Sequence, residues 1–306
     1  MNKKTTIGGQ ALLEGILMRG PENTRIVVRK PNKELEIKDD PIGTEKKNPI
    51  AKIPFIRGVV NFWDSMKYGM SALNYSASFF DEEEEELTKT EQWLNNKLGK
   101  EKFDKLLITF ATVLGVAMPV VLFIFLPTIL AGFFENIESN LLRNLVEGLL
   151  RVTIFLAFVI ITSKQSDVRR TYMYHGAEHK TIYCYEKGLP LTVENVRKQS
   201  CHHPRCGTSF MFVVMIISIL VFSFFKWTNP VVRVFMRLAL LPVVVGISYE
   251  FNRFVGRHDN WFTNLLRAPG MFLQNFTTVE PDDSMIEVAI VSIEGVIPEN
   301  KEKDNW

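Results

Sequence analysis

The chain alternates between long apolar runs and densely charged polar stretches. Residues 106–134 carry no charged side chain, and residues 207–225 form a second uncharged, largely apolar run. Because about 20 apolar residues cross the hydrocarbon core of a bilayer, both runs are predicted to be transmembrane helices. Pro119 and Pro127 lie inside the first run, where neighbouring helices can satisfy the backbone groups that a kink frees.

Two weaker apolar segments, 143–163 and 231–250, complete a predicted set of four membrane spans. Their charged residues lie toward the N-terminal ends, ahead of the apolar stretches, and include Glu147, Arg151, Arg233 and Arg237. This order predicts helices that start at one membrane face with snorkelling arginines. Glu147 and Arg151 are four residues apart and are expected to pair along one helix.

Lysine and arginine are distributed unevenly over the polar connections. They gather before the first span, in the connection 164–206 and after the fourth span, whereas 135–142 and 226–230 are short. The positive-inside rule therefore places both termini and the central connection in the cytoplasm. The basic start of the chain is followed by no apolar core of signal-peptide length, so we expect no cleaved targeting segment.

The predicted fold class is mainly α: a four-helix polytopic membrane protein with a small N-terminal β element and cytoplasmic interfacial helices. Short strand-like runs separated by turns fill residues 16–38, and residues 50–80 have the apolar spacing of a helix at the membrane surface, or equally of a soluble amphipathic helix. The predicted segments are 1–49 (β-rich, cytoplasmic), 50–105 (interfacial helix, acidic linker at 81–86 and pre-membrane helix), 106–163 (first transmembrane pair), 164–206 (cytoplasmic loop), 207–251 (second transmembrane pair) and 252–306 (C-terminal cytoplasmic helices and tail).

Charge and cysteine content argue against a nucleic-acid-binding protein and against a fold held by disulfides. The net charge is only +2, which argues against a global field for nucleic acid, so no sequence-specific nucleic-acid partner is expected. Cys184, Cys201 and Cys206 all fall in the central connection rather than spreading along the chain as a disulfide framework does. Reduced thiols or metal ligands are therefore predicted.

Four of the five histidines and all three cysteines lie between residues 175 and 206. In the segment YHGAEHK, His175 and His179 are four residues apart, so on a helix their imidazoles share a face and can chelate one divalent ion. Glu178 lies beside the second histidine, in the H-x-x-E-H order of inverted zinc-protease motifs. This glutamate is predicted as a general base, with metal ligand or orienting residue as alternatives.

The segment CHHPRCG supplies the second half of the predicted site. His203 and Cys206 are three residues apart, and together with the helical pair they complete a tetrahedral zinc set. Four protein ligands predict a structural site, whereas three leave a position for water and allow catalysis. Cys201 and His202 are substitute ligands, Cys184 is expected to be a buried apolar residue, and histidines that merely lie at the membrane interface are the plain alternative.

Two further carboxylates are assigned structural roles. Glu250 ends the fourth span, and Arg253 is its predicted ion-pair partner. Glu186 is predicted to be an exposed carboxylate at a helix end.

Four long blocks resemble the signature of a known family. They are GGQALLEGILMRGP at 8–21, VRRTYMYHGAEHKTIYCYE at 168–186, HPRCGTSF at 203–210 and PVVVGISYE at 242–250. The chain resembles, from about Thr6 to about Val291, the YqhQ-like family of bacterial multi-pass membrane proteins, whose function is unknown and which are described as predicted metal-dependent enzymes. The resemblance implies a bacterial cell membrane as the location.

The resemblance also implies that Gly8-Gly9-Gln10 and Glu14 belong with the functional core. Local sequence alone predicts only a tight turn at Gly8-Gly9-Gln10, because no phosphate-binding glycine motif follows. Genes of the family lie near translation genes, which is compatible with a partner in the membrane-insertion machinery.

Three functions are consistent with these patterns. The first is a membrane-embedded, zinc-dependent hydrolase of unknown substrate that works at the cytoplasmic face. The second is a non-catalytic membrane factor or scaffold whose partner is the translocon or the ribosome and whose metal or His/Cys cluster is structural. The third is transport of an ion or small solute through the charged residues of the weak spans; four helices leave little room for it. The sequence does not determine the oligomeric state.

Overall fold

The computed structural model describes residues 4–42, 53–80, 93, 96–134, 139–225 and 230–304. The acidic linker predicted at 81–86 lies outside these residues, as do residues 135–138 and 226–229 of the two short connections. The described part is mainly helical with a small N-terminal antiparallel sheet, which confirms the predicted α-rich class with an N-terminal β element.

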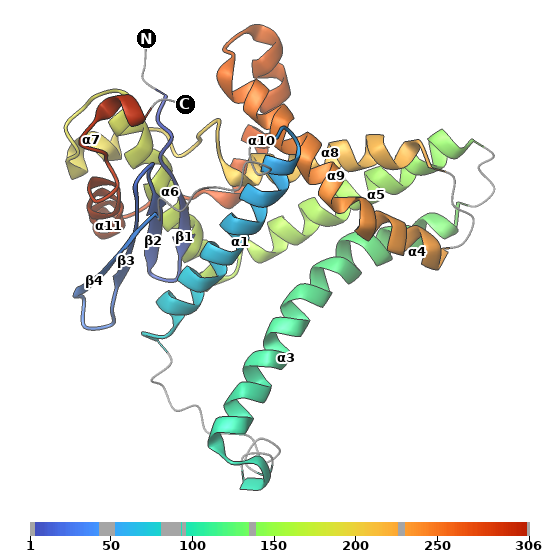
Figure 1. The fold of residues 1–306 in the computed structure, drawn as a ribbon, viewed down its shortest axis with the longest axis horizontal. Coiled ribbons are helices and arrows are strands. Elements are labelled where there is room, and N and C mark those ends of the chain that lie inside the picture. The colour runs from blue at the N-terminus through green and yellow to red at the C-terminus, as the bar shows by residue number, and fades with distance from the viewer. Residues whose placement is uncertain are drawn as a thin grey trace. The chain divides into compact units, whose positions relative to one another are not determined.

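The elements follow one another in a simple order (Figure 1). The strands are β1 (Gly8–Leu12), β2 (Gly15–Arg19), β3 (Asn23–Arg29) and β4 (Leu35–Pro41). The first helices are α1 (Ile56–Ala77), α3 (Lys100–Val120), the π-helical η2 (Val121–Phe125), α4 (Leu126–Gly132) and α5 (Asn140–Thr162). They are followed by α6 (Ser166–Glu186), α7 (Val193–Arg197), α8 (Gly207–Ser223), α9 (Pro230–Arg257), α10 (Trp261–Thr277), α11 (Asp283–Glu294) and the 3₁₀ turn η3 (Lys301–Lys303).

The sheet is an antiparallel meander in the order β1-β2-β3-β4 and is covered on both faces. Successive side chains of a strand point to opposite faces, so Ile16 and Met18 of β2 pack on α6 and α11, whereas Leu17 packs toward α1. In Figure 1, α6 and α11 lie beside the sheet, and α1 lies next to β1. This packing makes α6 part of the core of the N-terminal sheet.

The predicted turn at Gly8-Gly9-Gln10 is wrong, because these residues form the start of β1. The tight turn comes later, where Glu14 has a left-handed φ of 49° between β1 and β2. Two glycines weaken strand propensity, so nothing local marks this strand. Pairing of Gly9 with Met18 of β2 supplies the extended conformation that the local sequence does not specify.

The chain divides into two compact units. The first consists of residues 1–80, 158–218 and 240–306, and the second of residues 81–157 and 219–239. The sheet, α6, α10 and α11 belong to the first unit, together with every residue of the candidate metal site.

Among the described residues, three helical segments are long and apolar enough to cross a membrane: Lys105–Gly132, Leu142–Thr162 and Val231–Arg257. The predicted run 207–225 forms only the shorter apolar helix α8, which has 17 residues. At 1.5 Å per residue, α8 is about 25 Å long, short of the roughly 30 Å hydrocarbon core. The predicted set of four spans is therefore represented by three long helices and one shorter one.

The first of these segments contains both predicted helix breakers and remains continuous. Its π-helical turn, Val121–Phe125, lies between Pro119 and Pro127. The carbonyl of Phe123 in this turn accepts a hydrogen bond from Arg151 Nε of α5 at 3.0 Å. A side chain of a neighbouring helix thus bonds to the backbone in the stretch between the two prolines.

The predicted snorkelling of the span arginines is wrong. Arg151, Arg233 and Arg237 are buried within the second unit, where all three contact the carboxylate of Glu147. The predicted Glu147–Arg151 pair is confirmed at 3.6 Å, and Thr128 Oγ1 also donates to Glu147 at 2.8 Å. A carboxylate inside an apolar bundle is costly unless it is paired, so it draws the guanidinium groups inward.

Glu250 does form an ion pair, but its partner is not the predicted Arg253. Arg57 of α1 donates to both carboxylate oxygens, with Nε at 2.6 Å from Oε1. The two residues are 193 positions apart, so only the fold brings them together.

Candidate metal centre

Helix α6 presents His175 and His179 side by side on one face, with ring centroids 4.3 Å apart. Each ring is fixed through its Nδ1 by a backbone carbonyl: His175 bonds Thr277 O at 2.8 Å, and His179 bonds Cys201 O at 2.5 Å. A carbonyl oxygen can only accept a hydrogen bond, so both Nδ1 atoms are the donors, and in the neutral imidazole Nε2 is then the nitrogen with the lone pair. Histidines that bind metals have the same arrangement: one ring N–H donates to a protein acceptor, which fixes the ring, and the other nitrogen faces the metal.

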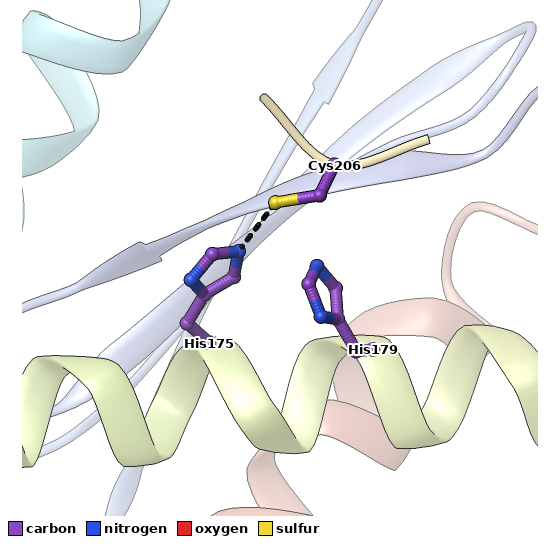
Figure 2. Close-up of side chains that lie close together, drawn as sticks. All are labelled: His175, His179 and Cys206. Carbon is purple, nitrogen blue, oxygen red and sulfur yellow. Dashed lines mark hydrogen bonds between the residues drawn. The ribbon is translucent and has the colours of Figure 1, made fainter. Parts of the chain in front are cut away.

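Cys206, which directly precedes α8, brings a sulfur to the two imidazoles. Its Sγ lies 3.2 Å from His175 Nε2, as Figure 2 shows. The three ligand atoms of His175, His179 and Cys206 all lie within 4.8 Å of one another. Thr208 contacts the sulfur from the first turn of α8 through its hydroxyl at 2.9 Å and its N–H at 3.4 Å. The fold thus gathers two nitrogen donors and one sulfur donor.

The electrostatics of these residues suit metal binding. Burial lowers the pKa of His179, which keeps this imidazole neutral. Burial opposes ionisation of the Cys206 thiol, but the contacts with His179 and Thr208 outweigh it and hold the pKa of Cys206 below its ordinary value. Neutral imidazole and thiolate are the forms that bind zinc, so the donor set fits this ion.

Glu178 lies on the same helix and is only 5% exposed. Its Oε1 accepts a hydrogen bond from the N–H of Gly9 at 3.0 Å, and its Oε2 is buried without a hydrogen-bond partner in the described part of the chain. Burial raises the pKa of this carboxyl to about 7. Glu178, His175, His179 and Cys206 together line a cavity of about 120 Å³.

Gly9 is required where it stands. A Cβ at this position would lie 2.8 Å from the backbone oxygen of Leu17 and 3.0 Å from the carboxyl carbon of Glu178. The absence of a side chain lets the strand reach the glutamate, and the N–H of Gly9 then fixes one carboxyl oxygen.

His203 lies near the three-residue group but is not one of its members. Its ring lines the same cavity, yet Nε2 faces Glu186 Oε2 at 3.4 Å and Nδ1 faces the N–H of Arg205 at 3.4 Å. Its backbone is clamped by Gln274, which accepts from His203 N at 2.8 Å and donates to His203 O at 2.9 Å. The structure therefore brings together three of the four predicted ligands, and a ligand role for His203 stays a prediction.

The substitute ligands Cys201 and His202 are not members of the three-residue group. Cys201 Sγ contacts Glu280 Oε2 at 3.1 Å instead. Cys184 is fully buried in a core cluster with Val196 and Ile286, as predicted for a small apolar residue.

Comparison with known proteins identifies the family. Residues 53–299 match the family described as a protein of unknown function, DUF1385. The chain is also 34% identical over 297 residues to the uncharacterized protein YqhQ of Bacillus subtilis (strain 168). The aligned region covers 93% of this chain and 90% of that protein. The chain belongs to this YqhQ-like family. No solved structure matches it.

Glu186 is not the exposed carboxylate that was predicted. Its side chain is only 9% exposed and accepts from the N–H of Thr5 at 2.8 Å while pairing with Arg205 and His203. Burial opposes ionisation, but these partners, with His203 first among them, hold the pKa of Glu186 below its ordinary value. Glu186 thus ties the N-terminal segment to the loop that carries Cys206.

Sequence reasoning missed a second anchor of the N-terminal segment. Asp304, in the predicted polar tail, is fully buried and accepts from Thr5 Oγ1 at 2.5 Å and from Tyr185 at 2.9 Å. Nothing in its local sequence distinguishes it from a solvated aspartate. Asp304 thus connects Thr5, which precedes β1, to Tyr185 of α6.

The family resemblance implies that Gly8-Gly9-Gln10 and Glu14 belong with the functional core, but not all of them lie at the candidate site. Gly8 and Gly9 line the cavity of the metal centre, whereas Glu14 does not. Glu14 instead pairs with Arg170 and accepts from the Tyr174 hydroxyl at 3.2 Å. It joins the first turn of the sheet to α6.

Proposed function

We propose that this protein is an integral membrane protein with a metal-dependent hydrolase site. The observation that carries the enzymatic part is the buried Oε2 of Glu178, which has no hydrogen-bond partner among the described residues and belongs to a residue that lines the same cavity as the three ligand residues. A buried carboxyl oxygen without a partner is unfavourable in a purely structural role. Such groups cluster where a site must move a proton.

Membrane integration is supported by the three long apolar helices, with α8 proposed as the fourth span. Large apolar side chains on these helices are exposed, among them Phe110, Leu149 and Phe235. A short span is accommodated by local thinning of the bilayer or by snorkelling flanks. The lysine and arginine distribution supports cytoplasmic termini and a site facing the cytoplasm of a bacterial cell.

In this proposal His175, His179 and Cys206 hold one divalent ion, and the nitrogen and sulfur donors favour zinc. A bound ion would supply Lewis acidity toward a substrate oxygen and toward water. Oε2 of Glu178 accepts the proton of the attacking water and passes it to the leaving group. The N–H of Gly9 keeps Oε1 in place, so the carboxyl rotates little during the transfer.

The first test replaces the proposed base. Glu178→Gln preserves shape and the acceptor for Gly9 but removes the basic oxygen. We expect metal content to stay at the wild-type level while hydrolysis of whichever chromogenic ester, amide or phosphate ester the wild type cleaves falls by about 10² or more. Glu194→Gln on the exposed surface of α7 is the control. Undiminished turnover in Glu178→Gln would refute the assigned role.

A second test asks whether the coordination sphere is open, without needing the substrate. Acetohydroxamate is added to the cobalt-loaded protein and its visible spectrum is recorded. Three protein ligands leave room for the hydroxamate, so we expect the cobalt bands to change. An unchanged spectrum would indicate a filled sphere.

The alternative is a non-catalytic membrane factor with a structural ion, serving a partner such as the translocon or the ribosome. The observation that favours it is the small size of the cavity, about 120 Å³, which leaves space for only a few water molecules. A structural ion with four protein ligands requires the His203 side chain to turn away from Glu186 and become the fourth ligand. Metal that is retained, closed to hydroxamate and lost in His203→Ala would establish this alternative.

A further inference from the structure

A second cavity, of about 310 Å³, adjoins the metal centre across the start of β1. The two cavities share three lining residues, Thr6, Gly8 and Gly9. Because the two glycines have no side chains, only their backbone contributes to this shared part of the lining. A molecule seated in the larger cavity therefore borders directly on the site of the proposed chemistry.

The larger cavity has a positive lining. Arg19 is the one charged residue among the described residues that line it, and its guanidinium lies over the ring of Tyr68, 5.2 Å from the centroid. No carboxylate of the described residues pairs with Arg19, in contrast to Arg25 on the neighbouring strand, which pairs with Asp39. Stacking on an aromatic ring orients a guanidinium and leaves its N–H groups for a ligand.

Hydrogen-bonding side chains accompany this charge. Gln10 from β1 and Ser65 from α1 line the same cavity as Arg19. A guanidinium fork with nearby amide and hydroxyl groups matches an oxyanion, which accepts several hydrogen bonds at once. Space of this volume is at the lower end of that found for small-molecule sites.

We propose that the larger cavity binds a phosphate group of an anionic substrate through Arg19. The bond to be cleaved then lies past Gly8 and Gly9 in the smaller cavity, beside Glu178. The first statement concerns anion binding alone, whereas the second rests on the proposed hydrolase function.

Gly8 offers a way to narrow the larger cavity without disturbing the fold. A Cβ at Gly8 would meet no atom within 4 Å, and its φ lies outside the left-handed region, so the backbone tolerates a larger side chain. Successive side chains of a strand point to opposite faces, and a Cβ at Gly9 would face Glu178, so a side chain at Gly8 points away from Glu178 and is expected to take up space in the larger cavity.

The anion site is tested first on metal-free protein in detergent, with inorganic phosphate as the probe and phosphorus NMR line broadening as the readout. We expect the wild type to bind phosphate and Arg19→Met to bind it at least about tenfold more weakly. Arg169→Met, at an exposed arginine of α6, is expected to bind as the wild type does. Absence of phosphate binding, or equal binding by Arg19→Met, overturns the proposal whether or not the protein binds metal.

The link between the cavities is tested on cobalt-loaded protein with two hydroxamates, one neutral and one bearing a phosphonate tail. We expect the phosphonate compound to bind at least about tenfold more tightly, and this advantage to vanish in Arg19→Met and in Gly8→Leu. Gly115→Leu, at another glycine with open space around it, is expected to preserve the advantage. Equal binding of the two compounds by the wild type refutes the link, whereas binding of neither refutes the open metal site.

Discussion

Metal analysis of the purified protein is expected to find about one divalent ion per chain, and His179→Ala and Cys206→Ser are expected to lose it. Each variant removes one of three donors whose ligand atoms lie within 4.8 Å of one another. Loss of even an outer partner costs 10- to 100-fold in metal affinity, so loss of a ligand is expected to cost at least about 100-fold. Mass spectrometry after dialysis against a weak chelator measures the remaining metal.

Two further variants make this experiment decisive. Cys201→Ser is the matched thiol control, because its sulfur contacts Glu280 rather than the histidines, and it is expected to retain the metal. His203→Ala distinguishes a three-ligand from a four-ligand site: metal is retained in the first case and lost in the second. A wild-type protein that contains no stoichiometric metal would contradict the proposed metal centre altogether.

Glu147→Ala is expected to produce the largest loss of stability. The carboxylate of Glu147 is the common partner of Arg151, Arg233 and Arg237, all of them buried. Removal of one member of a buried ionic group leaves the remaining charges poorly compensated, at a cost of about 3–5 kcal/mol. Thermal unfolding of the detergent-solubilised variant should show a fall in midpoint of several degrees or failure to accumulate.

Two comparisons separate this effect from a general loss of charge. Glu250→Ala breaks the more exposed pair with Arg57 and is expected to cost about 1 kcal/mol or less. The double variant Glu147→Met/Arg237→Met replaces the closest pair by apolar side chains and should recover part of the lost stability, because apolar replacements of buried pairs are often tolerated. If Glu147→Ala unfolds like the wild type, the buried network contributes little.

Local pattern was sufficient where a feature depends on near neighbours in the chain. The spacing of His175 and His179 placed both rings on one helical face, and the structure has them adjacent on α6. The three long apolar helices follow from the apolar stretches at 106–134, 143–163 and 231–250. Both results rest on helical periodicity and on side-chain hydropathy, which a single sequence displays.

Local pattern failed where a residue's role depends on distant partners. Glu186 and Asp304 are read locally as solvated carboxylates, yet both hold the N-terminal segment, through Thr5, 181 and 299 residues away. Arg233 and Arg237 lie on a different helix from their partner Glu147. The local sequence does not reveal this pairing, so it places both arginines at the membrane edge. Charge pairing inside a fold overrides the local preference for a polar surface.

By itself the sequence determined which residues are candidates for a site, since His175, Glu178, His179, His203 and Cys206 are distinguished by residue type and spacing. Only the tertiary structure decided how they are arranged. It turned His203 toward Glu186, brought Gly9 from the N-terminal strand onto Glu178, and left one carboxyl oxygen of Glu178 without a hydrogen-bond partner in the part of the chain that the structure describes. The physical reason is that ligand geometry depends on which backbone carbonyls and N–H groups surround each side chain. Those groups come from segments up to 169 residues away.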